Sequence, residues 1–569
     1  MLFLFKYIMF QLNYRKNKNI ELFKDIQEKM GVSKVQNYMP LYQHYFSLNN
    51  TNYNGMNLNT FKSINHIQSK IDENTYKTDV GVVHVKYAPL YDTYKYMVGK
   101  LQDVSVNVLP SFDGTPASIS ERKLYDVNNS SYTDGFFYFL SSILLNQHGF
   151  VNAIDFYGSY LCIKKDFKLN IADDAEFLYS SEFFKSNRGN LFNVNSEQEA
   201  QYARDFTRNC KKRLELGKTM DNVSVDSLGI IEELGEMFVD NVCNNNNDGE
   251  LVTEVEEMEL PVRENSSDSE CSSRYSNSSE EDATNWEDVE TDSEEEGEDE
   301  EGEDEEEEEE EDVVIEATIN EFPANMIFIE KMEGTMDSLL ENMEKEELNA
   351  ALFQVVITLA AYNKAFDFTH NDLHTNNVMY TNTKLKYLYY KLDGVNYKVP
   401  THGRIFKIID FGRSIYRYNG QLCHNDSYAV GNDAAGQYNF EPYSVDSKPQ
   451  MMPNQSFDLC RLGCSMYDNF FDFTFEEDDI PEEELLVKLV ASWCKDDKGK
   501  NVLYKKNGEE RYEGFKLYKM IARTVHGCVP REEVKKAVFS EYVMKTGPKK
   551  DVTVIDIDAI PCYVECSKN

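Results

Sequence analysis

The sequence predicts an α+β fold in two lobes, with a small β-rich N-terminal lobe and a mostly helical C-terminal lobe. Short β-branched runs occur early in the chain, strongly amphipathic helices occur late, and a long acidic, disordered insertion separates them. Hydrophobic residues make up 41% of the 569 residues, which is enough for a substantial core.

The N-terminal lobe is expected in two pieces, residues 78–164 and 313–335, after an N-terminal extension over residues 1–77 to which no chemistry can be assigned. Its elements follow from hydrophobic periodicity and β-branched content. They are a strand at Val80–Tyr87, a helix at Tyr132–His148, a strand or hairpin at Ala153–Ile163, and a last strand in MIFIEKM, resuming at Asn325.

The segment between these pieces divides into a predicted helical insertion, residues 165–243, and an acidic low-complexity stretch, residues 244–312. From Glu287 to Asp312, 21 of 26 residues are Asp or Glu, which is half of the net charge of −42. Like charges at this density oppose collapse, so the acidic stretch is expected to be disordered. It is a candidate binding site for basic partner proteins.

The C-terminal lobe is expected over residues 336–546, with a tail over 547–569. The periodicity predicts a strong helix at Glu347–Phe366 and another at Asp458–Phe470. Between them lie strands at Val378–Tyr380 and Phe406–Ile409, a hairpin at Lys384–Gly403 with a turn at Asp393–Gly394, and, in the tail, a strand at Val552–Val564.

Three side chains in this lobe suit the chemistry of phosphoryl transfer, which needs a carboxylate near the attacking hydroxyl and oxygen ligands for magnesium. Asp372 and Asn377 share the loop after the first strong helix, and Asp410 follows a second apolar segment. Asp372 would orient the hydroxyl and accept its proton, while Asn377 and Asp410 would hold the metal. Gly412 is expected to provide the sharp turn that aims Asp410.

The order of these residues, H-x-D-x-x-x-x-N and then D-F-G, resembles the protein-kinase signature. The resemblance implies ATP and Mg²⁺ as cofactors, and a two-lobed kinase fold. It implies that Lys86, in VHVK, holds the α- and β-phosphates, paired with Asp134 as the acid of the next helix. Asp458 would brace the loop from beneath, and no glycine-rich loop is visible before Lys86.

The strand and hinge around MIFIEKM resemble the adenine-binding edge of a kinase. Ile329 would line the back of the pocket, the Glu330 carbonyl and the Met332 amide would contact the base, and Asp337 would reach the ribose. Residues 413–453 would form the activation segment. Ser427, Tyr428 and Tyr438 are phosphorylation candidates within it.

Two substitutions mark a divergent kinase. His374 stands where a lysine is usual and is a candidate donor to the γ-phosphate, and Asn371 replaces the usual arginine. The loop also resembles that of aminoglycoside and choline phosphotransferases. From about Val80 to Thr546, excluding Lys165–Asn325, the chain resembles putative serine/threonine protein kinases of large nucleocytoplasmic DNA viruses.

That resemblance implies protein substrates and action in the cytoplasm of an infected cell, or packaging in the virus particle. Eleven scattered cysteines also suit a reducing compartment. Two alternatives stay open, a pseudokinase scaffold and a small-molecule phosphotransferase. The acidic surface argues against direct nucleic-acid binding, and Met1–Leu12 is too short to span a membrane.

Overall fold

The computed structural model describes residues 12–195, 315–429, 431–438, 444–445, 448–449, 452–471, 480–481, 483–549 and 552–565. These residues belong to one compact unit, Met1–Gln198 with Glu270–Asn569. The fold is mixed α/β, with a β-rich N-terminal region and helices later in the chain, as predicted. The predicted acidic stretch and most of the predicted helical insertion lie outside the described residues.

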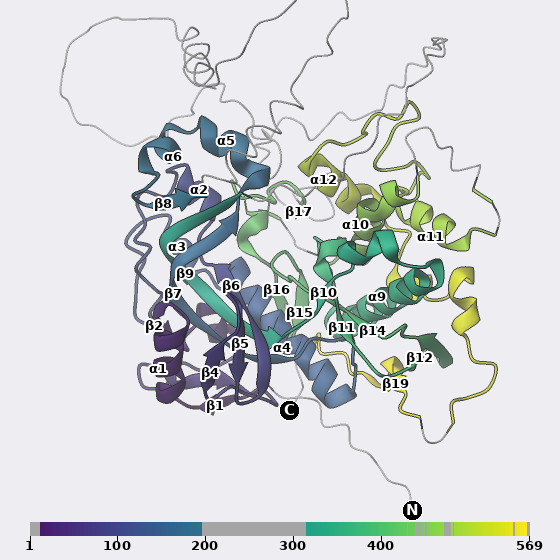
Figure 1. Cartoon of the computed structure of the whole chain (residues 1–569), viewed down its shortest axis with the longest axis horizontal. Helices are drawn as coiled ribbons and strands as arrows, with labels where there is room; N and C mark the ends of the chain where they lie inside the picture. The colour runs from purple at the N-terminus through teal and green to yellow at the C-terminus, as the bar shows by residue number, and fades with distance from the viewer. Residues whose placement is uncertain are drawn as a thin grey trace, which may run out of the picture. The chain divides into compact units, whose positions relative to one another are not determined.

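A seven-stranded antiparallel sheet forms the N-terminal region (Figure 1). Its order is β2-β7-β9-β6-β5-β4, with β8 paired to β9 as well. The strands β9 and β7 run side by side for most of their length, and β6 pairs with the C-terminal half of β9. The bounds are β2 Val32–Gln36, β4 Ile67–Lys70, β5 Thr75–Thr78, β6 Gly81–Pro89, β7 Phe156–Asn170, β8 Phe192–Val194 and β9 Glu316–Glu330.

The sheet includes residues outside the two segments, 78–164 and 313–335, that were predicted to form the N-terminal lobe. Strands β2, β4 and β5 come from residues 1–77, which the sequence suggested to be a separate extension. Strand β7 continues past residue 164 to Asn170, and β9 begins at Glu316 rather than at Asn325. These segments are polar enough to read as loops, and only cross-strand pairing, such as Lys168 opposite Thr318, makes them strands.

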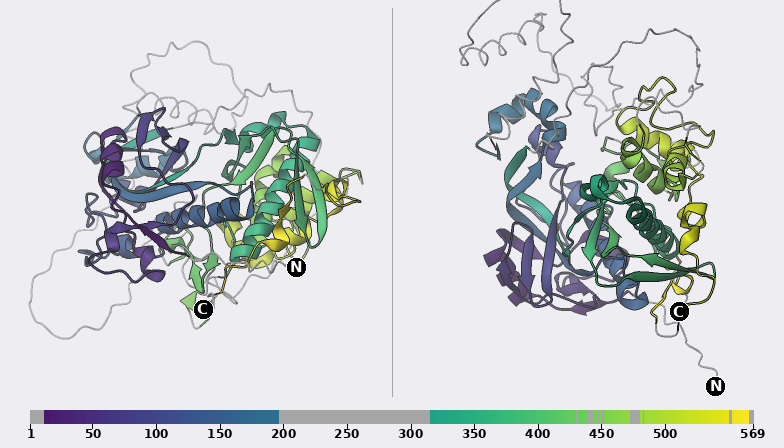
Figure 2. Two further views of the ribbon diagram at one scale, coloured as in Figure 1. Left: turned by 90° about the horizontal axis from the view of Figure 1, so that it is seen from below. Right: turned by 45° about the vertical axis from the view of Figure 1, so that its right-hand side comes forward.

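Helix α4, Ser130–His148, lies between this sheet and the C-terminal elements (Figures 1 and 2). The Asn129 side chain accepts from the Ser131 amide at 3.1 Å and caps its start. Gly135 lets the helix approach strand β9 closely, because an added Cβ would lie 2.9 Å from the side-chain nitrogen Nδ2 of Asn325. The helix is apolar nearly all round because it is buried on both sides.

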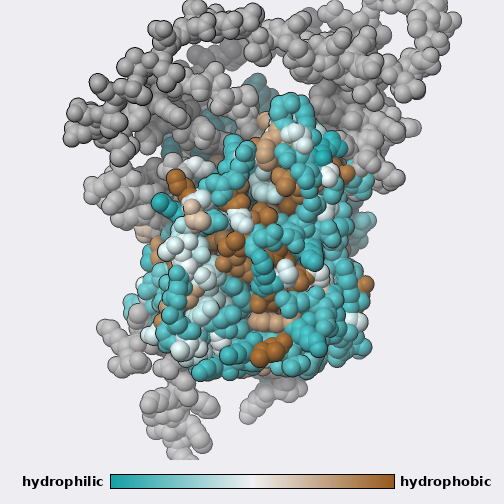
Figure 3. Space-filling view, turned by 90° about the vertical axis from the view of Figure 1, so that its left-hand side faces the viewer, coloured by the Kyte–Doolittle hydropathy of each residue, from teal (hydrophilic) through white to brown (hydrophobic). Residues whose placement is uncertain are grey.

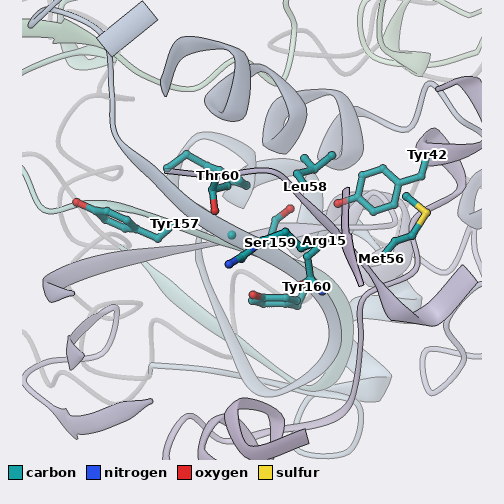
Figure 4. Close-up of a pocket in the computed structure, with 11 residues that line it drawn as sticks. Arg15, Tyr42, Met56, Leu58, Thr60, Tyr157, Ser159 and Tyr160 are labelled. Atoms are coloured by element: carbon teal, nitrogen blue, oxygen red, sulfur yellow. The ribbon is translucent and has the colours of Figure 1, made fainter. Parts of the chain in front are cut away.

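The segment before residue 60 packs beside α4 and β7. The Tyr45 ring stacks on Phe136 of α4 at 4.9 Å, and its hydroxyl lies 3.0 Å from the Cys423 sulfur. A small open pocket lies between this segment and β7, with Tyr42 and Met56 toward one end and Tyr157 at the other (Figure 4). Lys86 and the loop His370–Asn377 do not line it.

The C-terminal region is built around helix α9, Lys345–Phe366, which packs against strand β14, Arg404–Ile408. Strand β11, Val378–Asn382, pairs with β14 and with β10, Gly334–Thr335. The predicted hairpin is confirmed as β12 and β13, with its turn at Asp393–Gly394. The remaining bounds are β12 Tyr387–Leu392, β13 Val395–Pro400, α10 Phe457–Met466, α11 Leu485–Trp493, α12 Phe515–Thr524 and α13 Pro530–Glu533.

The predicted tail strand is shorter than expected. Only β19, Ile555–Asp556, pairs with β12, and a 3-10 helix over Ile557–Ala559 follows. The Asp556 carboxylate accepts from the Ala559 amide at 3.1 Å, so the chain turns away from the sheet. The other short elements are β1 Tyr14–Lys16, α1 Ile20–Lys29, β3 Met56–Leu58, α2 Thr93–Met97, α3 Arg122–Tyr125, α5 Ala175–Ser180, α6 Glu182–Asn187, β15 Tyr416–Tyr418, β16 Gln421–Cys423, β17 Ser444–Val445 and β18 Lys448–Pro449.

The surface is mostly hydrophilic, and on the face shown in Figure 3 the hydrophobic residues gather toward the middle. Large apolar side chains that are more than half exposed come from separate segments: Ile20, Phe61, Ile71, Ile119 and Leu385. Among the described residues, no helix combines the length and apolarity that a membrane crossing requires.

Candidate active site

The loop His370–Asn377 follows α9 and is held from below by Asp458 of α10. The two oxygens of this buried carboxylate accept from the backbone amides of His370 and Asn371, at 2.8 and 2.9 Å. Burial raises the pKa of Asp458 to about 7, and the two amide donors act against that rise. Asn371 takes the left-handed conformation at φ +65°, which is costly for a residue with a side chain. The loop is therefore bent and fixed by specific contacts.

His370 connects this loop to the segment that precedes Asp410. Its Nδ1 accepts from the Asp372 amide at 3.2 Å, and its Nε2 lies 2.8 Å from the Ile409 carbonyl oxygen. These partners require a neutral ring with the proton on Nε2. Burial lowers the pKa of His370, in agreement with that state.

Asp410 itself forms the sharp turn that was expected at Gly412. Its φ is +61°, whereas Gly412 is absent from the described residues with positive φ. The Asp410 amide donates to the Tyr138 hydroxyl at 2.9 Å, and the Phe411 amide donates to Asp134 at 2.9 Å. Helix α4 therefore fixes the strained backbone at Asp410. Gly412 leaves room for the Asp410 carboxylate, because a Cβ at this position would lie 3.3 Å from Asp410 Oδ1.

Lys86 of β6 links the two regions of the molecule. Its Nζ lies 2.7 Å from Asp134 Oδ2 and 2.8 Å from Asp410 Oδ1. Asp134 is buried, and burial raises its pKa to about 6 despite the lysine. Burial opposes the charge on Lys86, but the two carboxylates raise its pKa well above the usual value. Desolvation raises and Lys86 lowers the pKa of Asp410, with a net fall below its usual range.

Asn377 and His374 lie beside Asp372. The Asn377 amide nitrogen donates to the Asp372 carbonyl at 2.8 Å and contacts His374 Nε2 at 3.1 Å. Because an amide nitrogen only donates, His374 Nε2 accepts and the proton is on Nδ1. Burial lowers the pKa of His374, and the charges of Asp372 and Asp410 act against that fall. The amide oxygen of Asn377 is left to coordinate a cation.

The Asp372 carboxylate has partners on both oxygens. Tyr518 of α12 donates its hydroxyl to Oδ1 at 2.8 Å, and Arg413 Nε lies 3.8 Å from Oδ2. Burial raises the pKa of Asp372, but Arg413 and further donors hold it below the usual value. The carboxylate is therefore ionised and able to accept a hydrogen bond from a hydroxyl.

The residues expected to contact adenine and ribose occupy the end of β9 and the segment after it. Ile329 is buried in the sheet, and Met332 is also buried. The Glu330 carboxylate accepts from Lys407 Nζ at 2.6 Å and from the Asp155 amide at 2.8 Å, so its side chain faces away from solvent. Asp337 accepts a hydrogen bond from the Thr375 hydroxyl.

A phosphate-covering loop would be expected where β4 meets β5. The connecting turn, residues 71–74, reads Ile-Asp-Glu-Asn and contains no glycine. It lies near Lys86, because the Val85 amide donates to the Asn74 carbonyl at 2.7 Å. Gly81 lies at the opposite end of the hairpin, opposite Thr78, and cannot serve as the missing glycine.

The phosphorylation candidates of the activation segment are buried. Ser427, Tyr428 and Tyr438 are each less than 9% exposed, and the Tyr428 hydroxyl donates to the Arg413 carbonyl at 2.5 Å. Asp426 beside them pairs with Lys123 of α3 at 2.7 Å. The described part of the segment, residues 413–429 and 431–438, is therefore fixed by internal contacts and by contact with the rest of the protein.

The sequence pattern left four neighbours of the site unassigned. Arg413 follows the D-F-G motif directly, and a charged residue there was a usable signal. Tyr138 lies one helical turn after Asp134 on the same helix. Arg461 and Tyr518 carry no local signal, because only the packing of α10 and α12 brings them to Asp372.

The residues present fit a magnesium–nucleotide complex. Asp410 offers a half-exposed carboxylate and Asn377 an amide oxygen, both hard oxygen ligands. The described residues contain no cluster of three or more His, Cys, Asp or Glu side chains that could hold a metal. Two protein ligands suffice for Mg²⁺ when phosphate oxygens and waters complete the shell.

Comparison with known proteins points to protein kinases. No protein-family model matches the chain. The serine/threonine-protein kinase haspin of Mus musculus is 31% identical over 132 residues, which are 23% of this chain and 17% of that protein. Haspin of Bos taurus is 29% identical over 133 residues, 22% of this chain and 16% of that protein. The match spans less than a fifth of these relatives and supports a kinase-like fold.

Proposed function

We propose that this protein is a protein kinase of the two-lobed type, which transfers the γ-phosphate of ATP to serine or threonine hydroxyls in a Mg²⁺-dependent reaction. The observation that carries the proposal is the position of Lys86 between Asp134 and Asp410. A lysine paired with a helix acid and held beside a metal-ligand aspartate is the arrangement that phosphoryl transfer requires.

The remaining roles follow from the contacts of each side chain. Asp372 accepts the proton of the acceptor hydroxyl, and Arg413 and Tyr518 keep it ionised. Lys86 binds the α- and β-phosphates, and Asp410 and Asn377 hold Mg²⁺, which neutralises charge on the transferred group. His374 donates from Nδ1 toward the γ-phosphate, because Nε2 is occupied by Asn377.

The test is incubation of the purified chain with γ-labelled ATP, Mg²⁺ and generic protein acceptors, beside an Asp410→Ala control. Label on serine or threonine that disappears in the control supports the proposal. Magnesium-dependent ATP binding without labelled protein would contradict it and favour a small-molecule phosphotransferase or a scaffold. Circular dichroism of the Asp410→Ala protein establishes that the control is folded.

A further inference from the structure

A tyrosine of the chain itself occupies the acceptor side of the proposed base. The Tyr518 hydroxyl donates to Asp372 Oδ1 at 2.8 Å. A general base must lie within about 2.6–3.2 Å of the atom whose proton it takes. Tyr518 therefore meets the distance criterion that any acceptor hydroxyl of this site has to meet.

Asp372 and Asp410 are held in one site, because the His370 ring contacts the Asp372 amide at 3.2 Å and the carbonyl of Ile409, the residue before Asp410, at 2.8 Å. Asn377 makes a second link, since its side chain donates to the Asp372 carbonyl at 2.8 Å and its carbonyl accepts from the Ile409 amide at 2.9 Å. Tyr518 approaches Asp372 from α12, whereas Lys86 approaches Asp410 from β6. The hydroxyl and the phosphate-binding lysine thus enter the site from different elements.

Two guanidinium groups surround the tyrosine. Arg461 Nε donates to the Tyr518 hydroxyl at 3.0 Å, and its guanidinium carbon lies 5.1 Å from the ring centroid. The guanidinium carbon of Arg413 lies 5.7 Å from the same centroid. Within the part of the chain that the structure describes, Arg461 forms no ion pair with a carboxylate. A phosphate on Tyr518 would supply the anion that Arg461 lacks, since guanidinium binds phosphate strongly.

We propose that Tyr518 is an acceptor of this active site and is phosphorylated in cis. The inference rests on the proposed function. It adds one tyrosine hydroxyl of the chain itself to the serine and threonine hydroxyls proposed as acceptors. In the step, the Tyr518 oxygen bonds to the γ-phosphorus of ATP, and its proton passes to Asp372. The bond between the γ-phosphorus and the β,γ-bridging oxygen breaks, and ADP leaves. The phosphate then pairs with Arg461 and is repelled by Asp372, so the base becomes free for other acceptors.

Tyr504 provides a matched control, because its hydroxyl also donates to an aspartate at 2.8 Å. That aspartate is Asp468, which has no part in the proposed chemistry. The full chain, first treated with a phosphatase, is incubated with ATP, Mg²⁺ and a generic protein acceptor, and phosphate at each tyrosine is quantified by mass spectrometry. Tyr518→Phe, Tyr504→Phe and Asp410→Ala proteins are run in parallel.

The expected result is about 10²-fold more phosphate at Tyr518 than at Tyr504, the lower range of general-base catalysis. The initial rate per molecule should not depend on protein concentration, and tagged Asp410→Ala protein mixed with active protein should gain no phosphate at Tyr518. A labelled acceptor with unmodified Tyr518 would overturn this inference alone. Transfer to the tagged inactive chain would overturn the cis step. No label on any protein would overturn the proposed function as well.

Discussion

The loop His370–Asn377 and the hairpin β4–β5 come from the C-terminal and the N-terminal region of the chain and are built very differently. In the loop, buried partners such as Asp458 fix the backbone, and Asn371 stays in a strained conformation. In the hairpin, Ile71 and Asp72 of the turn are exposed, and no glycine is present. The chemical side of the site is pre-organised, whereas the side expected to cover the phosphates is not.

This difference predicts which substitutions should change the rate of the proposed reaction strongly and which should change it little. In the proposed kinase, a rigid loop around Asp372 would lower the cost of reaching the transition state, because its dipoles would need no reorganisation. A short polar turn offers few backbone amides to a triphosphate. We therefore expect substitutions around Lys86 and Asp458 to have large effects, and substitutions in the turn to have small ones.

The largest effect is expected from Lys86→Ala. Loss of a charged donor at a transferring group lowers kcat by about 10²–10³-fold. The substitution also leaves Asp134 buried without its cation, which costs about 3–5 kcal/mol when the carboxylate is ionised. Urea unfolding at pH 8 and at pH 5 measures this, and the loss should be smaller at pH 5, where Asp134 is protonated.

Lys62→Ala is the control for the lysine, because Lys62 pairs with Asp155 but is itself more than half exposed. Asp155 is buried but keeps a hydrogen bond from the Asn146 side chain at 2.9 Å, and in the described part of the chain Lys62 contacts none of the proposed site residues, so activity should stay unchanged. Equal losses of activity in the two variants would show that Lys86 has no special place in the site.

Asp458→Ala is expected to rank second. It removes the acceptor of two buried backbone amides, at about 1–3 kcal/mol for each unsatisfied group. The loop should lose its fixed shape, so kcat should fall while KM for ATP changes little. Chemical denaturation and steady-state kinetics check the two parts. Asp458→Asn keeps one acceptor oxygen and should lie between the wild type and Asp458→Ala; a kinetically normal Asp458→Ala protein would remove the basis for calling the loop pre-organised.

The pH dependence of the Lys86–Asp134 pair gives a third expected effect. The pKa of Asp134 is about 6 in the folded protein and 3.8 in its ordinary state. As the pH falls below about 6, Asp134 takes up a proton, Lys86 loses one of its two carboxylate partners, and activity should decrease. Because the folded state binds this proton more tightly, the same group makes folding more favourable as the pH falls from 6 toward 4.

Between pH 6 and pH 4, protonation of Asp134 should therefore lower the activity and raise the free energy of unfolding. Thermal unfolding from pH 4 to pH 7 measures the stability, and the difference between wild type and Asp134→Asn isolates this group. A difference that is constant with pH would mean that Asp134 does not titrate there.

The sequence could predict those site residues that lie in short local patterns, but not those that only packing brings to the site. Asp372 and Asn377 lie five residues apart in one short motif, and Asp410 begins the D-F-G motif, so local patterns named all three as candidates. Asp134 could be named because it is the single acid of its predicted helix. Tyr518 lies 146 residues from Asp372, and its position depends on how α12 packs, which no local pattern encodes.

The fold shows the same limit. Helices α4 and α9 were predicted closely because a long apolar face is a local signal. Strands β4 and β5 were missed because they are short and polar and become strands only through pairing, β4 with β5 and β5 with β6. The hairpin expected to cover the phosphates is made of these strands, and its turn, residues 71–74, contains no glycine.

The smallest effect is expected from Asp72→Ala in the β4–β5 turn. Asp72 Oδ1 accepts from the amides of Asn74 and Thr75 at 3.0 and 2.8 Å, which orders the turn. Without it, the turn must be ordered when ATP binds, and KM for ATP should rise less than about tenfold, with kcat unchanged. Asp79→Ala is the matched control, because Asp79 also accepts from backbone amides, at residues 65 and 66, but lies at the far end of the hairpin. A hundredfold rise in Asp72→Ala alone would mean that this turn holds the phosphates as firmly as a glycine-rich loop, and the contrast between the two sides of the site would then be wrong.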